Sequence, residues 1–308
     1  MKLVSFQSSN GARLGASIDD KVLDLQATYQ AAGVAGAPDT LLGGMIAFLE
    51  GGQQAFDAAA HAIGVAEANP EKGVWATDAL LPPIPNPNKI LLLAGNYAAH
   101  IEEGGGTALA KQETTPRVFM KPPTTTLTAH ENPIIIPPNG VFTDWEAELG
   151  VVIGKRGKFI TADDAYDHVA GYTIVNDVSE RELKVKETRV SQAGDEWFDW
   201  LNGKWFDTFA PMGPCLTTKD DIPDPHNLRI SLRVNGETKQ DANTGQMIFN
   251  IAEVIEFIST LVTLEPGDII STGTPSGVGH PNEKLGDGDV VEVEIEKIGI
   301  LRNPVVQQ

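Results

Sequence analysis

The feature that most constrains the fold is the run from Val141 to Gly154, VFTDWEAELGVVIG, in which two glutamates lead into an unbroken apolar stretch. Leu149 to Ile153 are apolar on both faces of an extended chain, which predicts a buried β-strand. Glu146 and Glu148 are two residues apart, so both carboxylates point the same way in a strand. Two carboxylates at the mouth of a buried strand repel each other and lose hydration, for which a divalent cation is the usual compensation. The competing interpretation, a solvated face of an edge strand, has equal weight from this stretch alone.

The composition indicates a soluble globular protein of one large domain or two ordinary ones, with 308 residues, 41% hydrophobic and 21% charged. The net charge of −19 argues against nucleic acids and anionic membranes as partners, because both recruit basic surfaces. The single cysteine, Cys215, fits a reducing compartment, and no apolar run is long enough to span a bilayer. The N-terminus lacks the apolar core of a signal peptide, and we expect a cytoplasmic protein.

A proline-rich segment, LLPPIPNPNKI, separates two parts of the chain. Before it, Lys2 to Phe6 and Arg13 to Ile18 have the pattern of short strands, and Thr40 to Glu50 and Gln53 to Ala66 have helical spacing. Four prolines within six residues stiffen the chain and forbid helix. We therefore predict a small N-terminal α+β domain over residues 1–84 and a second domain over residues 85–308.

A histidine–glutamate pair follows the predicted strand from Lys89 to Ala94. If the segment from Tyr97 to Glu103 forms a helical turn, His100 and Glu103 are three residues apart and face each other. A carboxylate beside an imidazole orients the ring and raises its basicity, which is the arrangement of a general base. An ordinary surface pair is the competing interpretation.

Two further charged residues occupy positions that suit a site. Asp177 follows the predicted strand from Gly171 to Val175, where loops carry ligands, although it also suits the N-cap of a helix over Ser179 to Arg189. Lys204 stands among glycine and aromatic residues in GKWFDTF and must find an anion or lose its proton, unless it snorkels to the surface. The later turn TGTPSGVG offers backbone N–H groups that suit a carboxylate, but tight turning explains its glycines equally well.

The C-terminal third has the clearest secondary-structure signals. Alternating apolar residues from Leu228 to Val234 end in Asn235-Gly236, which predicts a hairpin. The segment from Asn250 to Thr263 predicts an amphipathic helix with a capping box between Asn250 and Glu253. We find no internal repeat and no nucleotide-binding fingerprint.

Five motifs in a fixed order resemble the fumarylacetoacetate hydrolase family, over most of the chain from Lys89 to Val305. They are GNYAAHIEE, DWEAELGVVIG, GYTIVNDVSERE, GKWFDTFAPMGP and DIISTGTPSGVG. The resemblance implies an α+β, mostly β fold in which mixed β-sheets roll into a flattened barrel, and it implies a homodimer.

The resemblance also implies roles for individual residues. It implies Mg²⁺ or Mn²⁺ held by Glu146, Glu148 and Asp177. It further implies that His100 and Glu103 form a water-activating dyad and that Lys204 meets a developing oxyanion. Arg181, Thr274 and Tyr97 would contact the substrate. The segment 183–203 is longer and more aromatic than the family leads us to expect, and we expect it to overhang the pocket.

The residue types suit the chemistry of 2-oxo acids, which chelate a hard cation through carboxylate and keto oxygens. We expect hydrolysis of an acylpyruvate or related 2,4-dioxo acid, with a metal-stabilised enolate as the product of carbon–carbon cleavage. The alternatives are a decarboxylase of oxaloacetate-like acids, an isomerase or dehydratase of 2-oxo acids, and a catalytically silent metal-binding scaffold.

Overall fold

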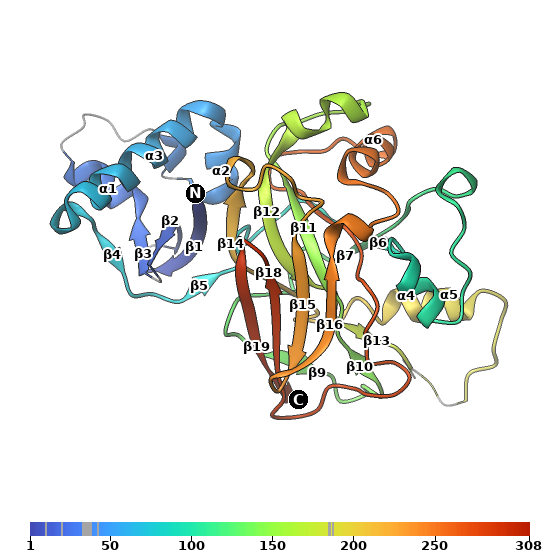
Figure 1. The fold of residues 1–308 in the computed structure, drawn as a ribbon. Helices are drawn as coiled ribbons and strands as arrows, with labels where there is room; N and C mark the ends of the chain where they lie inside the picture. Colours follow the sequence, from blue (N-terminus) through green and yellow to red (C-terminus); the bar gives the residue numbers. More distant parts are fainter. Residues whose placement is uncertain (10, 20, 33–38, 42, 184–185, 187) are drawn as a thin grey trace.

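The computed structural model describes residues 1–9, 11–19, 21–32, 39–41, 43–183, 186 and 188–308. Strands dominate the described chain and form two main sheets, with helices around their margins (Figure 1). This architecture confirms the predicted α+β, mostly β class.

A twelve-stranded mixed sheet runs through the molecule in the order β4-β3-β2-β1-β14-β12-β11-β17-β6-β7, with β5 beside β1 and β8 beside β14. Its strands are β1 (Lys2–Ser8), β2 (Gly11–Ile18), β3 (Lys21–Asp24), β4 (Trp75–Ala76), β5 (Leu80–Leu81), β6 (Ile90–Ala94), β7 (Arg117–Lys121), β8 (Leu127–Thr128), β11 (Ala147–Ile153), β12 (Val169–Asn176), β14 (Ala210–Thr218) and β17 (Ile269–Ser271). Most neighbours are antiparallel, while β17 pairs with β6 and β14 with β8 in parallel.

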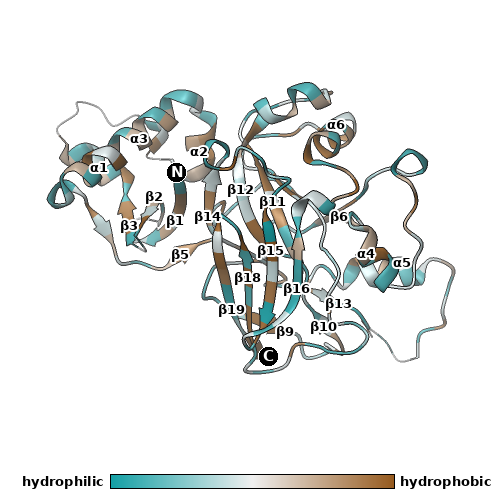
Figure 2. Cartoon of the chain, in the orientation of Figure 1, coloured by the Kyte–Doolittle hydropathy of each residue, from teal (hydrophilic) through white to brown (hydrophobic). Residues whose placement is uncertain are grey.

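A second sheet packs against this one in the order β16-β15-β18-β19-β9. Its strands are β9 (Ile134–Ile136), β15 (Arg229–Val234), β16 (Glu237–Asn243), β18 (Val290–Ile295) and β19 (Gly299–Gln307). Polar and apolar residues alternate along β18 (Figure 2), and Val291, Val293 and Ile295 are the buried members. They belong to one apolar core with residues of β11 and β12, such as Val151 and Ile174, so the two sheets share an interior.

The helices lie at the edges of the sheets. They are α1 (Leu25–Ala31), α2 (Gly44–Glu50), α3 (Gly52–Ala68), α4 (Ala98–Glu103), α5 (Asp195–Asn202) and α6 (Ile251–Leu261), with 3-10 turns over Asp39–Leu41, Pro70–Lys72, Lys111–Glu113, Ala162–His168, Lys219–Asp221 and Thr244–Gln246. The predicted capping box at the start of α6 is present, since Asn250 and Glu253 each accept the other's backbone N–H. No helix in the described ranges has the length and apolarity that a membrane crossing requires.

The N-terminal part extends the large sheet. β1 pairs antiparallel with β14, with Leu3 opposite Leu216, and α1 and α3 lie over this end of the sheet (Figure 1). Phe48 and Ala59 from its helices share an apolar cluster with Met212 of β14. The boundary near residue 84 stays a prediction about domain organisation.

Three neighbouring strands bring the acidic residues to one place. All seven residues of β11 are buried, as the apolar run predicts. The antiparallel register places Ala147 opposite Asn176 on β12, so the chain just before β11 lies beside the chain just after β12. On the other side of β11, Gly150 lies opposite Ser271 of β17, which leads into the TGTPSG turn.

The helix predicted over Ser179 to Arg189 is wrong at its start. Ser179–Glu180 forms the short strand β13, which pairs with β10 (Thr143–Asp144). Glu180 is buried and accepts hydrogen bonds from Phe142 N and Thr143 Oγ1, so strand pairing overrides local helix propensity. Asp177 is therefore no helix N-cap; residues 184, 185 and 187 lie outside the described ranges.

Candidate metal centre and active site

Three carboxylates converge at the start of β11 and the end of β12. Glu146, Glu148 and Asp177 each offer an oxygen, and these oxygens lie within 4.8 Å of one another. The backbone fixes the arrangement, because Asp177 N donates to Glu146 O at 2.9 Å. At most 5% of any of the three residues is exposed. The two-residue spacing and the strand-end position thus bring together all three residues that the resemblance implies as ligands.

Two cations balance this cluster from the cavity side. Lys204 Nζ lies 2.9 Å from Glu146 Oε2 and 2.6 Å from Asp177 Oδ2, and Arg181 Nη2 donates to Glu146 Oε1. Burial acts to raise the pKa of Glu146, but the charges of Lys204 and Arg181 outweigh it and hold this pKa below its usual value. Burial likewise acts to lower the pKa of Lys204, and the two carboxylates raise it, so Lys204 is held as an ammonium.

Glu148 is the least compensated member of the triad. Its Oε2 accepts from Ser271 Oγ and Gly273 N, but its buried Oε1 has no hydrogen-bond partner among the described residues. Burial raises the pKa of Glu148, and the negative charges of Asp177 and Glu146 raise it further. A positive charge beside Oε1 would reverse this shift.

The donor set therefore fits a hard divalent cation. All three donors are carboxylate oxygens, which Mg²⁺, Ca²⁺ and Mn²⁺ prefer, and the unpartnered oxygen of Glu148 belongs to the same cluster. Both metals that the resemblance implies, Mg²⁺ and Mn²⁺, suit such ligands.

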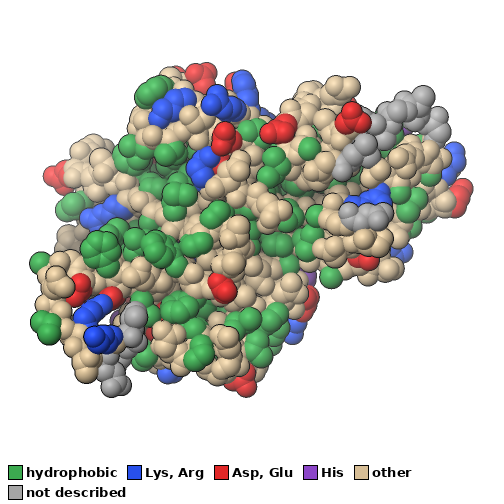
Figure 3. Space-filling view, turned by 180° about the vertical axis from the view of Figure 1, so that it is seen from behind, with side chains coloured by type: hydrophobic (Ala, Val, Ile, Leu, Met, Phe, Trp, Pro, Cys, Tyr) green, Lys and Arg blue, Asp and Glu red, His purple; other side chains and the backbone are tan. Residues whose placement is uncertain are grey.

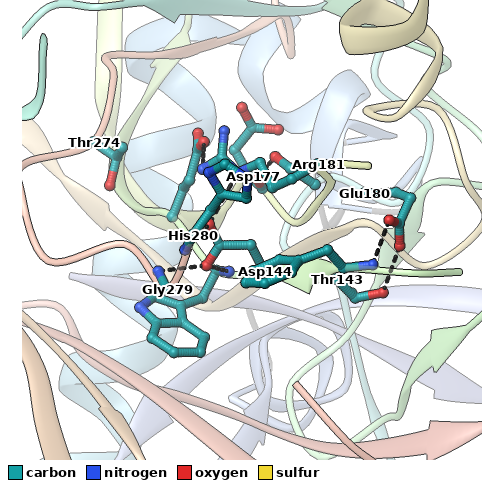
Figure 4. Close-up of polar contacts among 12 residues, drawn as sticks. Thr143, Asp144, Asp177, Glu180, Arg181, Thr274, Gly279 and His280 are labelled. Atoms are coloured by element: carbon teal, nitrogen blue, oxygen red, sulfur yellow. Dashed lines mark hydrogen bonds and ion pairs between the residues drawn. The ribbon is translucent and has the colours of Figure 1, made fainter. Parts of the chain in front are cut away.

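A small cavity of about 100 Å³ opens beside the cluster. Polar groups of His100, Arg181, Lys204 and Thr274 line it together with Glu146 and Asp177. The Thr274 hydroxyl accepts from Gln240 Nε2 at 2.9 Å, which fixes the TGTPSG turn against the second sheet. Figure 4 shows Thr274 on one side of this region and Glu180 on the other, with Asp177 and Arg181 between them.

The predicted dyad is near the cavity, but its two members differ in their contacts. His100, on α4, lines the cavity, and its Nδ1 is 3.5 Å from Glu103 Oε2 without making a hydrogen bond. Both oxygens of Glu103 instead accept from Gly277 N at 3.0 Å. Gly277 has a φ of +101°, and a Cβ there would lie 2.1 Å from Lys239 O, so only glycine suits this contact. Glu103 thus ties α4 to the TGTPSG turn.

Tyr97 is placed behind the cluster rather than in the cavity. It is 2% exposed and does not line the cavity, and its buried hydroxyl has no hydrogen-bond partner in the described part of the chain. Burial and the charge of Glu148 raise the pKa of Tyr97. Its role as a substrate contact stays a prediction.

Two charged residues of the network were not singled out from the sequence. Lys121, at the end of β7, lies 2.7 Å from Asp177 Oδ1, and burial lowers its pKa to about 8 against the opposing charge of Asp177. Asp144 accepts from Arg181 Nε at 2.9 Å and from Gly279 N at 2.7 Å (Figure 4). Lys121 had no local signal, because its partner is far away in the sequence. Asp144 had one, as a third acidic residue in DWEAE.

Part of the aromatic segment reaches the cavity. Trp200, on α5, lines it and makes an edge contact with Phe119 at 4.8 Å between ring centroids. Lys204 Nζ lies 5.4 Å from the Phe119 ring centroid and 5.5 Å from that of Trp200. Trp197 stacks on Trp200 and is itself exposed. The aromatic side chains thus form the apolar wall behind the lysine.

Comparisons with known proteins agree with this geometry. A family model described as fumarylacetoacetate (FAA) hydrolase, C-terminal, matches residues 89–306. The chain is 41% identical over 314 residues to the mitochondrial oxaloacetate tautomerase FAHD2A of Bos taurus, covering 99% of this chain and 92% of that protein. The fumarylacetoacetate hydrolase from Exiguobacterium antarcticum superposes with a TM-score of 0.78 at 30% identity, covering all of both chains. A maleylpyruvate hydrolase from Sphingobium sp. SYK-6, in complex with manganese(II) and pyruvate, gives 0.73 at 30% identity, covering 100% of this chain and 99% of that one.

Proposed function

The chain belongs to the fumarylacetoacetate hydrolase family, and we propose on this premise that it catalyses keto–enol interconversion of an oxaloacetate-like 2-oxo acid with a divalent cation. The observation that carries the proposal is the 41% identity to an oxaloacetate tautomerase over 99% of the chain. The small cavity of about 100 Å³ supports a short substrate.

The residues around the cavity have separate tasks in this reaction. When bound by Glu146, Glu148 and Asp177, the cation supplies positive charge that polarises the substrate's carbonyl. Lys204 is placed to stabilise the oxygen on which negative charge develops. His100 takes the proton from the carbon next to the carbonyl, through Nε2, since Nδ1 faces Glu103. The proton returns to the enolate oxygen, so no water is consumed and no bond between carbons is broken.

Hydrolysis of an acylpyruvate is the second candidate, and the similarity to a maleylpyruvate hydrolase favours it. Hydrolysis needs a water that His100 activates and that attacks a second carbonyl. The higher identity to the oxaloacetate tautomerase, 41% against 30% for the maleylpyruvate hydrolase, favours the tautomerase as the first candidate.

The deciding experiment supplies the purified protein with enol-oxaloacetate and, separately, with acetylpyruvate. The decay of the enol absorbance reports tautomerisation, and NMR of the products reports cleavage or loss of CO₂. We expect rapid loss of the enol form, inhibition by EDTA and recovery with added Mn²⁺ or Mg²⁺. Cleavage of acetylpyruvate without accelerated enol decay would establish the hydrolase instead, and full activity after complete metal removal would exclude the metal centre.

We also infer that residues 85–308 form the catalytic unit and that the protein is a cytoplasmic homodimer. The family match over residues 89–306 supports the catalytic unit, and the resemblance to the family supports the homodimer. Basic side chains are scattered over the face seen in Figure 3 rather than gathered in one area, which fits a small-molecule substrate better than a nucleic acid.

A further inference from the structure

Lys121 is the one cation of the acidic network, among the described residues, that does not line the cavity. Its side chain is 0% exposed, so it cannot contact a substrate. Arg181 and Lys204, in contrast, both line the cavity. Burying a lysine is costly unless it is paired, and Lys121 is paired with Asp177, which the proposed function makes a metal ligand.

The contacts of Lys121 suit a charged ammonium. Its Nζ lies 2.7 Å from Asp177 Oδ1 and donates to Val178 O at 2.7 Å and to Phe209 O. All three neighbours are acceptors. Two N–H groups serve the two carbonyl oxygens, and the positive charge faces the anionic Asp177 Oδ1, which makes no hydrogen bond among the described residues.

Asp177 is shared by two lysines, one on each oxygen. Lys121 faces Oδ1, and Lys204 donates to Oδ2 at 2.6 Å. Lys204 lines the cavity, whereas Lys121 approaches Asp177 from outside the cavity. Its two carbonyl acceptors hold Lys121 in place, so Lys121 is a fixed charge that acts on the triad through Asp177.

A charge count shows what this fixed charge does. The network holds four carboxylates, Asp144, Glu146, Glu148 and Asp177, and three cations, Lys121, Arg181 and Lys204. With every group ionised its charge is −1, and a divalent cation brings it to +1. Without Lys121 the loaded network would be neutral. Because the surroundings are buried, this difference is weakly screened.

We propose, on the basis of the proposed function, that Lys121 is a charge-setting residue that acts through Asp177, weakening metal binding and strengthening the binding of anionic substrate and enolate. Lys121 does not touch the substrate, so it is not a catalytic residue; its charge acts through Asp177. The proposal predicts effects of opposite sign on two ligands, which loss of structure alone would not produce.

The test compares wild type with Lys121→Met by calorimetric titration, first with Mn²⁺ alone and then with oxalate, a planar dianion that resembles an enolate, at saturating Mn²⁺. We expect Lys121→Met to bind Mn²⁺ at least roughly tenfold more tightly and oxalate at least roughly tenfold more weakly, from the loss of one nearby charge in a poorly screened site. Lys121→Arg, which keeps the charge, should restore both affinities toward wild type.

Lys89→Met is the matched control. Lys89 also bridges to a buried aspartate, at 2.9 Å from Asp268, but it does not line the cavity or contact the triad. It should leave both affinities unchanged. If Lys121→Met does not fold, as judged by circular dichroism, Lys121→Gln decides, because it keeps N–H donors for the carbonyl oxygens without the charge.

Weaker or unchanged Mn²⁺ binding in a folded, uncharged Lys121 variant overturns the proposal while leaving the metal centre intact. Failure of the wild-type protein to bind Mn²⁺ overturns the metal centre and this proposal with it. Equal weakening of both ligands shows a structural role for Lys121 only, which also overturns the proposal.

Discussion

At the scale of single residues, Glu148 is the carboxylate whose state depends most on a bound cation. Burial and two neighbouring carboxylates raise its pKa, and its Oε1 has no partner among the described residues. A divalent cation favours the ionised form, so metal binding should release protons when Glu148 is protonated beforehand. The other two triad members already have lysine or arginine partners.

We predict that Glu148→Gln lowers Mn²⁺ affinity by more than about 100-fold and abolishes turnover. Loss of a residue that only hydrogen-bonds to a metal ligand typically lowers metal affinity ~10–100-fold, and Glu148→Gln removes a charged ligand itself. Titration calorimetry measures the affinity. Glu180→Gln is the control, since Glu180 is as deeply buried but lies outside the triad, and its carboxylate accepts from Phe142 N, Thr143 Oγ1 and Glu182 N. Retained Mn²⁺ affinity in Glu148→Gln would remove Glu148 from the ligand set.

His100 provides the second prediction at this scale. His100→Ala should slow enol decay by about 100-fold or more, the usual range for a lost general base. Binding of Mn²⁺ should stay unchanged, because His100 belongs to α4 and not to the triad. Stopped-flow absorbance measures the rate, and Glu102→Ala on the same helix is the control. A normal rate in His100→Ala would assign proton transfer to another group.

The sequence predicts these residues to different extents. The alternation of a strand predicts Glu146 and Glu148 on one side, and their carboxylates do meet in the triad, although β11 begins only at Ala147. Asp177 required the resemblance, because its position after a strand suits an N-cap equally well. Lys121 could not be predicted, because its contact with Asp177 joins β7 to the chain after β12. These two strands are not neighbours in the sheet or in the sequence.

At the scale of elements, local signals succeed where they do not compete with strand pairing. The capping box of α6 forms as its residues predict. The segment after Asp177 has equally helical residues, yet β13 forms because Thr143 and Glu180 pair across from each other. Long-range pairing of this kind leaves no trace in a short stretch of sequence.

The start of α6 offers a test at this scale. Asn250→Ala should lower the free energy of unfolding by about 1 kcal/mol, because the backbone N–H of Glu253 loses its acceptor. Urea unfolding followed by circular dichroism measures the change. Thr260→Ala is a control on the same helix, exposed and outside the cap, and should change stability by less than about 0.5 kcal/mol. A cost as small as that of the control would mean that the capping box contributes little to α6.

At the scale of the whole molecule, the proline-rich segment divides the sequence into two parts, but the large sheet contains strands from both of them. β1 continues the large sheet through β14, and the apolar cluster around Leu3 includes Leu216 and Ile269 from beyond the boundary. Removing the N-terminal part would expose this cluster and the edge of β14. The small N-terminal part and the catalytic part are therefore expected to unfold together, although the proline segment distinguishes them.

We predict a single calorimetric transition whose measured enthalpy equals the van't Hoff enthalpy, as for one cooperative unit. Leu3→Ala should lower the midpoint of that whole transition, since loss of a buried leucine costs ~2–5 kcal/mol and Leu3 is 0% exposed. Lys2→Ala, at an exposed position of the same strand, should leave the midpoint unchanged. Leu3→Ala could instead split the transition in two, lowering the midpoint of the first while Mn²⁺ still raises the midpoint of the second. The catalytic part would then fold on its own, because a ligand stabilises only the unit that binds it.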